Sequence, residues 1–154
     1  SPFGQRDRAG GPGSHLLRHH RTSAPPRHRT LSQQSRIDRR LEAARARLDR
    51  VQPADLADEV AAGALVVDLR PTANRQDEGD LPGAVVIDRI HLEWRLDHTS
   101  GAALDGVDDD TRVILVCNEG YASSLAAADL RALGLRRVTD LDGGYRGWRA
   151  HLRP

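Results

Sequence analysis

The chain's one cysteine, Cys117, stands where a buried strand would end and a helix would begin. The apolar run 113–116 precedes it, and residues 118–122 connect it to a helix-like segment starting near Ser123. The first turn of a helix offers unpaired N–H groups and the positive end of the helix dipole, which favour a thiolate in this loop. Gly120 permits the tight curvature that turns backbone N–H groups inward as an anion nest. The pattern predicts a reactive thiol, and an inert core cysteine is the alternative.

Other residues that could carry chemistry form weaker patterns. Asp68 and Arg70 follow another apolar run. We expect Asp68 to cap the loop and pair with Arg70, whose guanidinium could instead contact a substrate. The three histidines beyond residue 90 have no partner at zinc-ligand spacing, and the acidic run 108–110 lacks the further ligands of a calcium loop. No nucleotide-binding glycine pattern is present, so the sequence predicts neither a metal nor a cofactor.

Strands and helices alternate after residue 51. Short apolar runs predict strands over 64–69, 84–87, 112–116 and 137–141. Helical spacing and terminating glycines predict helices between Pro53 and Gly63, over 123–133 and over 144–152. The continuous apolar runs indicate strands buried on both faces, as in a parallel sheet covered by helices. The order of elements therefore predicts an α/β fold within one domain, 51–154.

The first 50 residues differ in charge from the remainder. They hold 12 Arg against 4 acids, whereas residues 51–154 hold 11 Arg against 18 acids. We expect residues 1–34, rich in Arg, His, Gly and Pro and without apolar period, to be a disordered tail. Its charge would suit an anionic partner such as RNA or phospholipid headgroups, and a merely solvated tail is the alternative.

Residues 35–50 predict an amphipathic helix. Ser35 is a suitable N-cap, and apolar residues follow at spacings of 4, 3, 4 and 3 from Ile37 to Val51. Two heptads are short for a coiled coil, so docking onto the following domain is favoured over dimerisation. No apolar run approaches the roughly 20 residues of a membrane span, and the N-terminus lacks the apolar segment of a secretory signal. We expect no membrane span and a cytoplasmic location.

Four motifs, in this order and spacing, resemble those of a single-domain rhodanese. They are VVDLR at 66–70, GDLPGA at 79–84, VCNEGY at 116–121 and DGGYRGW at 142–148. The resemblance covers about residues 49–152. It implies a five-stranded parallel sheet with helices on both faces. It also places the strand ending at Val116 between those ending near Leu69 and Leu141.

The resemblance also implies a chemistry for the cysteine. Cys117 would accept a sulfane sulfur as a persulfide and pass it to a thiol, cyanide or protein acceptor. Arg70 and the segment 143–146 would flank the mouth of the pocket. Residues 118–122 would form the cradle whose backbone N–H groups hold the persulfide. The expected substrate-binding residues are Asn118, Glu119, Gly120, Tyr121, Ala122, Ser123 and Arg70. A small-molecule sulfur donor and a thiol or protein acceptor are thus the expected partners.

The loop departs from the rhodanese pattern at two positions. Ala122 stands where many rhodanese loops carry an arginine, and Glu119 adds a carboxylate that would repel a dianion unless it points outward. We therefore expect thiosulfate to be a poor donor and a less charged persulfide or polysulfide to be preferred. Related phosphatases and arsenate reductases use a loop one residue longer that ends in arginine. Ser123 occupies that place, so phosphatase activity is not expected.

Three functions remain open at the level of sequence. A sulfurtransferase is favoured because the cysteine and a plausible cradle are both present. A non-catalytic rhodanese-like binding or regulatory module is the alternative, since Ala122 removes a charge normally used on a substrate. A redox sensor is a third and weaker candidate, which would need an external thiol to resolve the oxidised cysteine.

Overall fold

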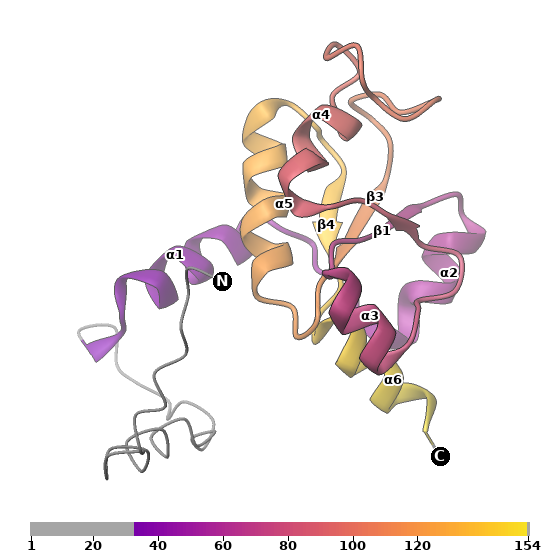
Figure 1. Ribbon diagram of the computed structural model, residues 1–154. Helices are drawn as coiled ribbons and strands as arrows, with labels where there is room; N and C mark the ends of the chain where they lie inside the picture. The colour runs from indigo at the N-terminus through magenta and orange to yellow at the C-terminus, as the bar shows by residue number, and fades with distance from the viewer. Residues whose placement is uncertain (1–32, 154) are drawn as a thin grey trace, which may run out of the picture. The chain divides into compact units, whose positions relative to one another are not determined.

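The computed structural model describes residues 33–153 (Figure 1). The tail predicted for residues 1–34, and any partner for it, lies outside this part except for the last two residues. In chain order the elements are α1 (Arg36–Arg45), η3 (Pro53–Asp55), α2 (Leu56–Ala61), β1 (Leu65–Asp68), α3 (Thr72–Glu78), β2 (Val85–Val86), η4 (Arg89–His91), α4 (Leu92–Leu96), β3 (Val113–Val116), α5 (Ala122–Leu133), β4 (Val138–Asp140) and α6 (Gly144–Leu152).

Four parallel strands of the described chain form one sheet in the order β2-β1-β3-β4. β3 thus lies between β1 and β4, as the sequence resemblance implied. Where five strands were expected, the fifth position is a single parallel bridge between Val51 and Leu141. The Val51 N–H donates to the Asp140 carbonyl at 2.9 Å, and its carbonyl accepts from the Asp142 N–H at 2.8 Å. Pro53 follows two residues later and begins a 3₁₀ helix, so the pairing ends there.

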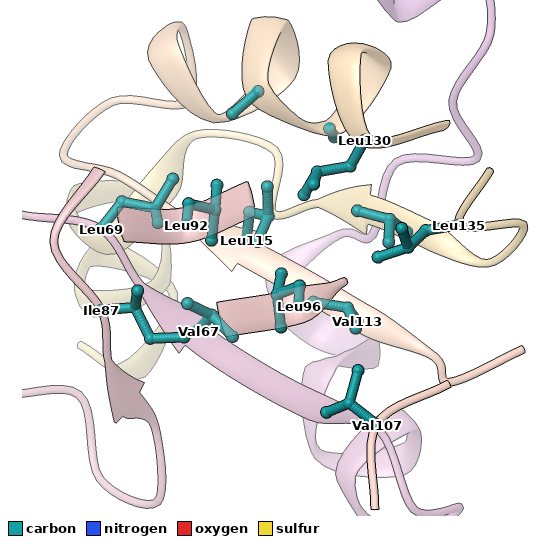
Figure 2. Packing of buried hydrophobic residues seen from close by; sticks show 13 residues of the cluster. Val67, Leu69, Ile87, Leu92, Leu96, Val107, Val113, Leu115, Leu130 and Leu135 are labelled. Atoms are coloured by element: carbon teal, nitrogen blue, oxygen red, sulfur yellow. The ribbon is translucent and has the colours of Figure 1, made fainter. Parts of the chain in front are cut away.

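The continuous apolar run of β3 divides between two cores, because successive side chains of a strand point to opposite faces. Val113 and Leu115 belong to one cluster of buried residues, and Ile114 and Val116 belong to the other. The first cluster includes leucines of α4 and α5, and Figure 2 shows them against the strands. The second includes residues of α2 and α6. Helices therefore cover both faces of the sheet, which confirms the predicted α/β architecture.

The strand predicted at 84–87 is not buried in the way expected. β2 is a two-residue strand at the edge of the sheet, and Val85 and Val86 are 36% and 44% exposed. Ile87, which follows β2, is the residue of this segment that enters the core. An edge strand has one neighbour and lies at the limit of the covering helices, so an apolar pair there stays partly in contact with solvent. Val60 of α2 is likewise half-exposed, although its spacing from Leu56 predicted burial.

α1 docks on the domain, in agreement with the favoured alternative. The Ser35 Oγ accepts the Asp38 N–H at 3.1 Å, which confirms the predicted cap. The helix ends at Arg45 rather than near residue 50 and packs against α5 (Figure 1). Ala44 is buried, whereas Ile37 in the first turn is exposed. Between residues 33 and 153 no helix is both long and apolar enough to cross a membrane.

Candidate active site

Cys117 follows β3 directly, and the loop behind it folds back over the sulfur. The Cys117 Sγ accepts hydrogen bonds from the backbone N–H groups of Gly120 at 3.2 Å and Ser123 at 3.4 Å. The side chain is nearly buried, with 9% of the residue exposed. Two amides therefore converge on one sulfur, an arrangement that can stabilise negative charge there.

The first turn of α6 supports this loop from its backbone. The Tyr145 N–H donates to the Cys117 carbonyl at 2.8 Å, and the Arg146 N–H donates to the Asn118 carbonyl at 3.0 Å. Gly144 makes the approach feasible, since a Cβ at this position would lie 2.5 Å from the Cys117 carbonyl oxygen. Gly144 also has φ of +61°, a conformation that favours glycine. The segment 143–146, expected to flank the pocket mouth, contacts the loop backbone through Tyr145 and Arg146.

A buried carboxylate lies two hydrogen bonds from the sulfur. The Ser123 Oγ is 3.2 Å from the Cys117 Sγ and donates to the Asp140 Oδ2 at 2.7 Å. The Ser124 Oγ donates to the same oxygen at 2.7 Å. Asp140 is fully buried at the end of β4 and pairs with Arg50, whose Nε lies 2.9 Å from the Asp140 Oδ1. Burial alone would lower the pKa of Arg50, but the hydrogen bond and charge of Asp140 raise it.

Asp68 and Arg70 form a buried ion pair at the end of β1. The Arg70 Nη2 lies 2.8 Å from the Asp68 Oδ2, and the Asp68 Oδ1 also accepts the Arg70 backbone N–H at 3.0 Å. The guanidinium donates to the Gly79 carbonyl at 2.9 Å and stacks 3.8 Å from the ring centroid of Tyr145. The structural role expected for Asp68 is thereby confirmed. The Arg70 Nη1 is buried and has no hydrogen-bond partner among the described residues.

A cavity of about 480 Å³ adjoins Cys117. It is lined by Leu69, Arg70, Pro71, Asn74, Arg89, Cys117, Asn118, Glu119, Tyr121 and Ala122. Five of the predicted cradle and pocket residues thus face one space with Cys117, whereas Gly120 and Ser123 contact the sulfur through their backbone. Within residues 33–153, no group of three His, Cys, Asp or Glu side chains is placed to hold a metal ion.

The Glu119 carboxylate pairs with Arg146, a partner that the sequence did not indicate. Its Oε1 lies 2.5 Å from the Arg146 Nη1, and the Arg146 Nε lies 2.8 Å from the Glu78 Oε1. Hydrogen bonds from Arg146 and from the Asn118 amide lower the pKa of Glu78. Arg146 thus offsets part of the Glu119 charge, and Glu78 shares the same guanidinium.

Several residues of this site were not predicted from the sequence, and four charged residues are among them. Arg45, Arg50 and Asp140 surround the loop, and Arg89 lines the cavity. Asp140 had a detectable signal, because a carboxylate inside the predicted strand 137–141 must find partners when that strand is buried. The three arginines had no detectable signal in the sequence, because each reaches the site through contacts between segments that are distant in the chain.

Cys117 lies at the end of a strand in a parallel α/β sheet, its sulfur accepts hydrogen bonds from two backbone amides, and a cavity adjoins it. These features define a class of α/β domains in which the loop after a strand can stabilise a negative charge. The sequence matches the family model of the rhodanese-like domain over residues 52–151. The chain belongs to this family.

Relatives with known names support the assignment. The chain is 32% identical over 102 residues to the thiosulfate sulfurtransferase GlpE of Pseudomonas entomophila (strain L48), covering 66% of this chain and 84% of the relative. It is 33% identical over 87 residues to the protein of the same name from Pseudomonas fluorescens (strain Pf0-1), covering 56% and 72%.

Solved structures share the fold. A Rhodopseudomonas palustris protein described as "Possible Tyrosine Phosphatase" matches with a TM-score of 0.68 and 26% identity, over 84% of this chain and 98% of that chain. The human single-domain sulfurtransferase TSTD1 matches with a TM-score of 0.59 and 23% identity, over 68% of this chain and 97% of that chain. The second likeness concerns the fold alone.

Proposed function

We propose that this protein is a sulfurtransferase in which Cys117 carries a sulfane sulfur as a persulfide. The observation that carries the proposal is the pair of amides, from Gly120 and Ser123, that converge on the Cys117 Sγ beside an accessible cavity. A nearly buried sulfur with two N–H donors is suited to hold negative charge before and after it binds a second sulfur. The names of the bacterial relatives support the same activity.

The reaction has two displacements at sulfur. The Cys117 thiolate attacks the sulfane sulfur of the donor, the new S–S bond forms, and the donor's leaving group departs with the electron pair of the broken bond. A thiolate, cyanide or protein thiol then attacks the outer sulfur, and Cys117 leaves as a thiolate. Electrons balance within each displacement, so no oxidant or cofactor is consumed. The reducing cytoplasm, which keeps a lone thiol free, is the location we propose.

The donor that we propose is an organic persulfide or polysulfide rather than thiosulfate. The cavity wall includes the apolar residues Leu69, Pro71 and Ala122. Asp68 already compensates Arg70, which leaves that guanidinium little net charge for a dianion. The Arg70 Nη1, which has no hydrogen-bond partner among the described residues, suits one anionic oxygen or sulfur of a donor. Thiosulfate, the donor named for the relatives, is the competing candidate.

Intact-mass analysis tests the proposal directly. Wild type and Cys117→Ser are incubated with thiosulfate or, separately, with polysulfide, and cyanide is then added. We expect only the wild type to gain one sulfur atom, more readily from polysulfide, and to lose it to cyanide. Equal or better loading from thiosulfate would contradict the proposed donor. Failure of both donors, where a known rhodanese is loaded, would favour a non-catalytic binding module.

A phosphatase is the activity that the name of the Rhodopseudomonas palustris protein raises. Such enzymes hold the equatorial phosphate oxygens with a loop arginine. In this chain Ser123 occupies the corresponding position and turns its hydroxyl to Asp140. The loop 118–123 contains no arginine for those oxygens, so we propose no phosphatase activity for Cys117.

A further inference from the structure

Two arginines from outside the matched family region reach the backbone of the cysteine loop. The match begins at residue 52, whereas Arg45 ends α1 and Arg50 precedes the Val51 bridge. The Arg45 Nη2 donates to the Gly120 carbonyl at 2.8 Å, and the Arg50 Nη2 donates to the same carbonyl at 3.0 Å. One loop carbonyl therefore accepts from two guanidinium groups.

This contact fixes the orientation of a peptide in the loop. The Gly120 carbonyl and the Tyr121 N–H belong to the same trans peptide and point in opposite directions. Because the arginines hold the carbonyl, the Tyr121 N–H points away from them. Gly120 has φ of +86°, and a Cβ there would lie 3.1 Å from the Arg50 Nη2. The Arg45 guanidinium also lies 5.4 Å from the ring centroid of Tyr121, which lines the cavity. The arginines thus contact both the backbone of the loop and a side chain at the cavity.

Arg50 also compensates the buried carboxylate behind the sulfur. Its Nε and Nη2 lie 2.9 and 3.2 Å from the two oxygens of Asp140. Asp140 is connected to the Cys117 Sγ through the Ser123 hydroxyl, by hydrogen bonds of 2.7 and 3.2 Å. A carboxylate this close would disfavour a thiolate if it were unpaired. Asp142 pairs with another nitrogen of Arg50, at 3.0 Å, and lies partly in solvent.

We propose that Arg45 and Arg50 are positioning residues for the sulfur cradle: they hold the peptide between Gly120 and Tyr121, within the loop that folds over the sulfur, and Arg50 keeps the charge of Asp140 from opposing the Cys117 thiolate. The inference rests on the proposed function, in which Cys117 reacts as a thiolate. It makes α1 and the following segment part of the site, although they precede the matched family region.

Alkylation of Cys117 by iodoacetamide, followed by intact mass across a pH series, tests this in the full chain. Arg40→Gln is the matched control, because Arg40 is an exposed residue of the same helix. We expect Arg45→Gln to slow alkylation about threefold at pH 7, and Arg50→Gln about tenfold, with the pH midpoint moved upward. The double variant Arg50→Gln/Asp140→Asn removes both charges and should recover most of the rate.

Wild-type pH profiles in folded Arg45→Gln and Arg50→Gln would overturn the proposal. A double variant as slow as Arg50→Gln would overturn the charge role of Arg50, because both variants lack its contact with the Gly120 carbonyl. If circular dichroism shows that Arg50→Gln is unfolded because Asp140 is left unpaired, Arg45→Gln and the double variant decide the outcome. Sulfur loading of the wild type is measured separately. A wild type that takes up no sulfur but shows arginine-dependent alkylation refutes the transferase and retains the positioning role.

Discussion

Gly144 stands at the contact between α6 and the cysteine loop, and replacing it with alanine tests how tightly the two are joined. The new Cβ would lie 2.5 Å from the Cys117 carbonyl oxygen and 2.7 Å from the Asn118 carbonyl carbon. Both are backbone atoms, so the clash cannot be relieved by a rotamer change. The two hydrogen bonds from the first turn of α6 to these carbonyls, of 2.8 and 3.0 Å, would lengthen with the displacement.

The expected cost has two parts. A left-handed conformation costs a non-glycine residue about 1–2 kcal/mol. Overpacking against the loop adds about 1–3 kcal/mol, for a total of about 2–5 kcal/mol. Gly106→Ala is the matched control, because Gly106 has φ of +78° and a Cβ added there would have nothing within 4 Å. Gly106→Ala should therefore lose only the free energy that the left-handed conformation costs.

Urea unfolding gives both free energies, and iodoacetamide alkylation reports on the loop. We expect Gly144→Ala to lose at least about 1 kcal/mol more than Gly106→Ala, within the overpacking range, and to change the alkylation rate of Cys117. Equal losses in the two variants, with unchanged alkylation, would show that α6 and the loop separate without cost. The proposed support of the loop by α6 would then be wrong.

Three further outcomes are expected. Ala122→Arg should raise kcat/KM for thiosulfate about tenfold relative to polysulfide, because it adds a cation to the cavity lining; a steady-state comparison of the donors measures this. Arg70→Gln should cost about 3–5 kcal/mol in urea unfolding, since Asp68 would be left buried and unpaired. The pKa of Glu78 is lowered by hydrogen bonds from Arg146 and Asn118, so its contribution to stability is present above pH 4.5 and is lost as pH falls through the lower folded value. Urea midpoints of Glu78→Gln should therefore fall less than those of the wild type on acidification.

The central strands were predictable because their apolar runs are continuous. Val113 to Val116 are all buried, and their two-sided packing is what a parallel sheet between helices requires. α3 was not predicted, because the segment TANRQDE has no apolar period and contributes no buried residue. α4 was missed for a different reason: Leu92 and Leu96 are fully buried, but five residues give too short a pattern to identify a helix.

For the site too, features made by neighbouring residues could be predicted from the sequence, and contacts between distant residues could not. Gly120 and the helix after Ser123 predicted a cradle, because a turn and a helix N-terminus are encoded by neighbouring residues. The pairing of Arg50 with Asp140 joins residues 90 positions apart, and periodicity carries no information about it. Glu119 shows the same limit, since its partner Arg146 is 27 residues away and changes the charge that the loop presents.

The loop around Cys117 is held by contacts between residues that are far apart in the chain. The order in which these contacts form during folding decides when the thiol becomes enclosed. The Arg45 contact with Gly120 closes a separation of 75 residues, and the Arg50 contact with Asp140 closes one of 90. Such contacts carry a large loop-closure entropy and form late when local structure appears first. A nascent chain would therefore expose an unsupported cysteine until β4 has joined the sheet and α6 has packed against the loop. Chemical labelling of Cys117 during refolding would follow the last steps of assembly.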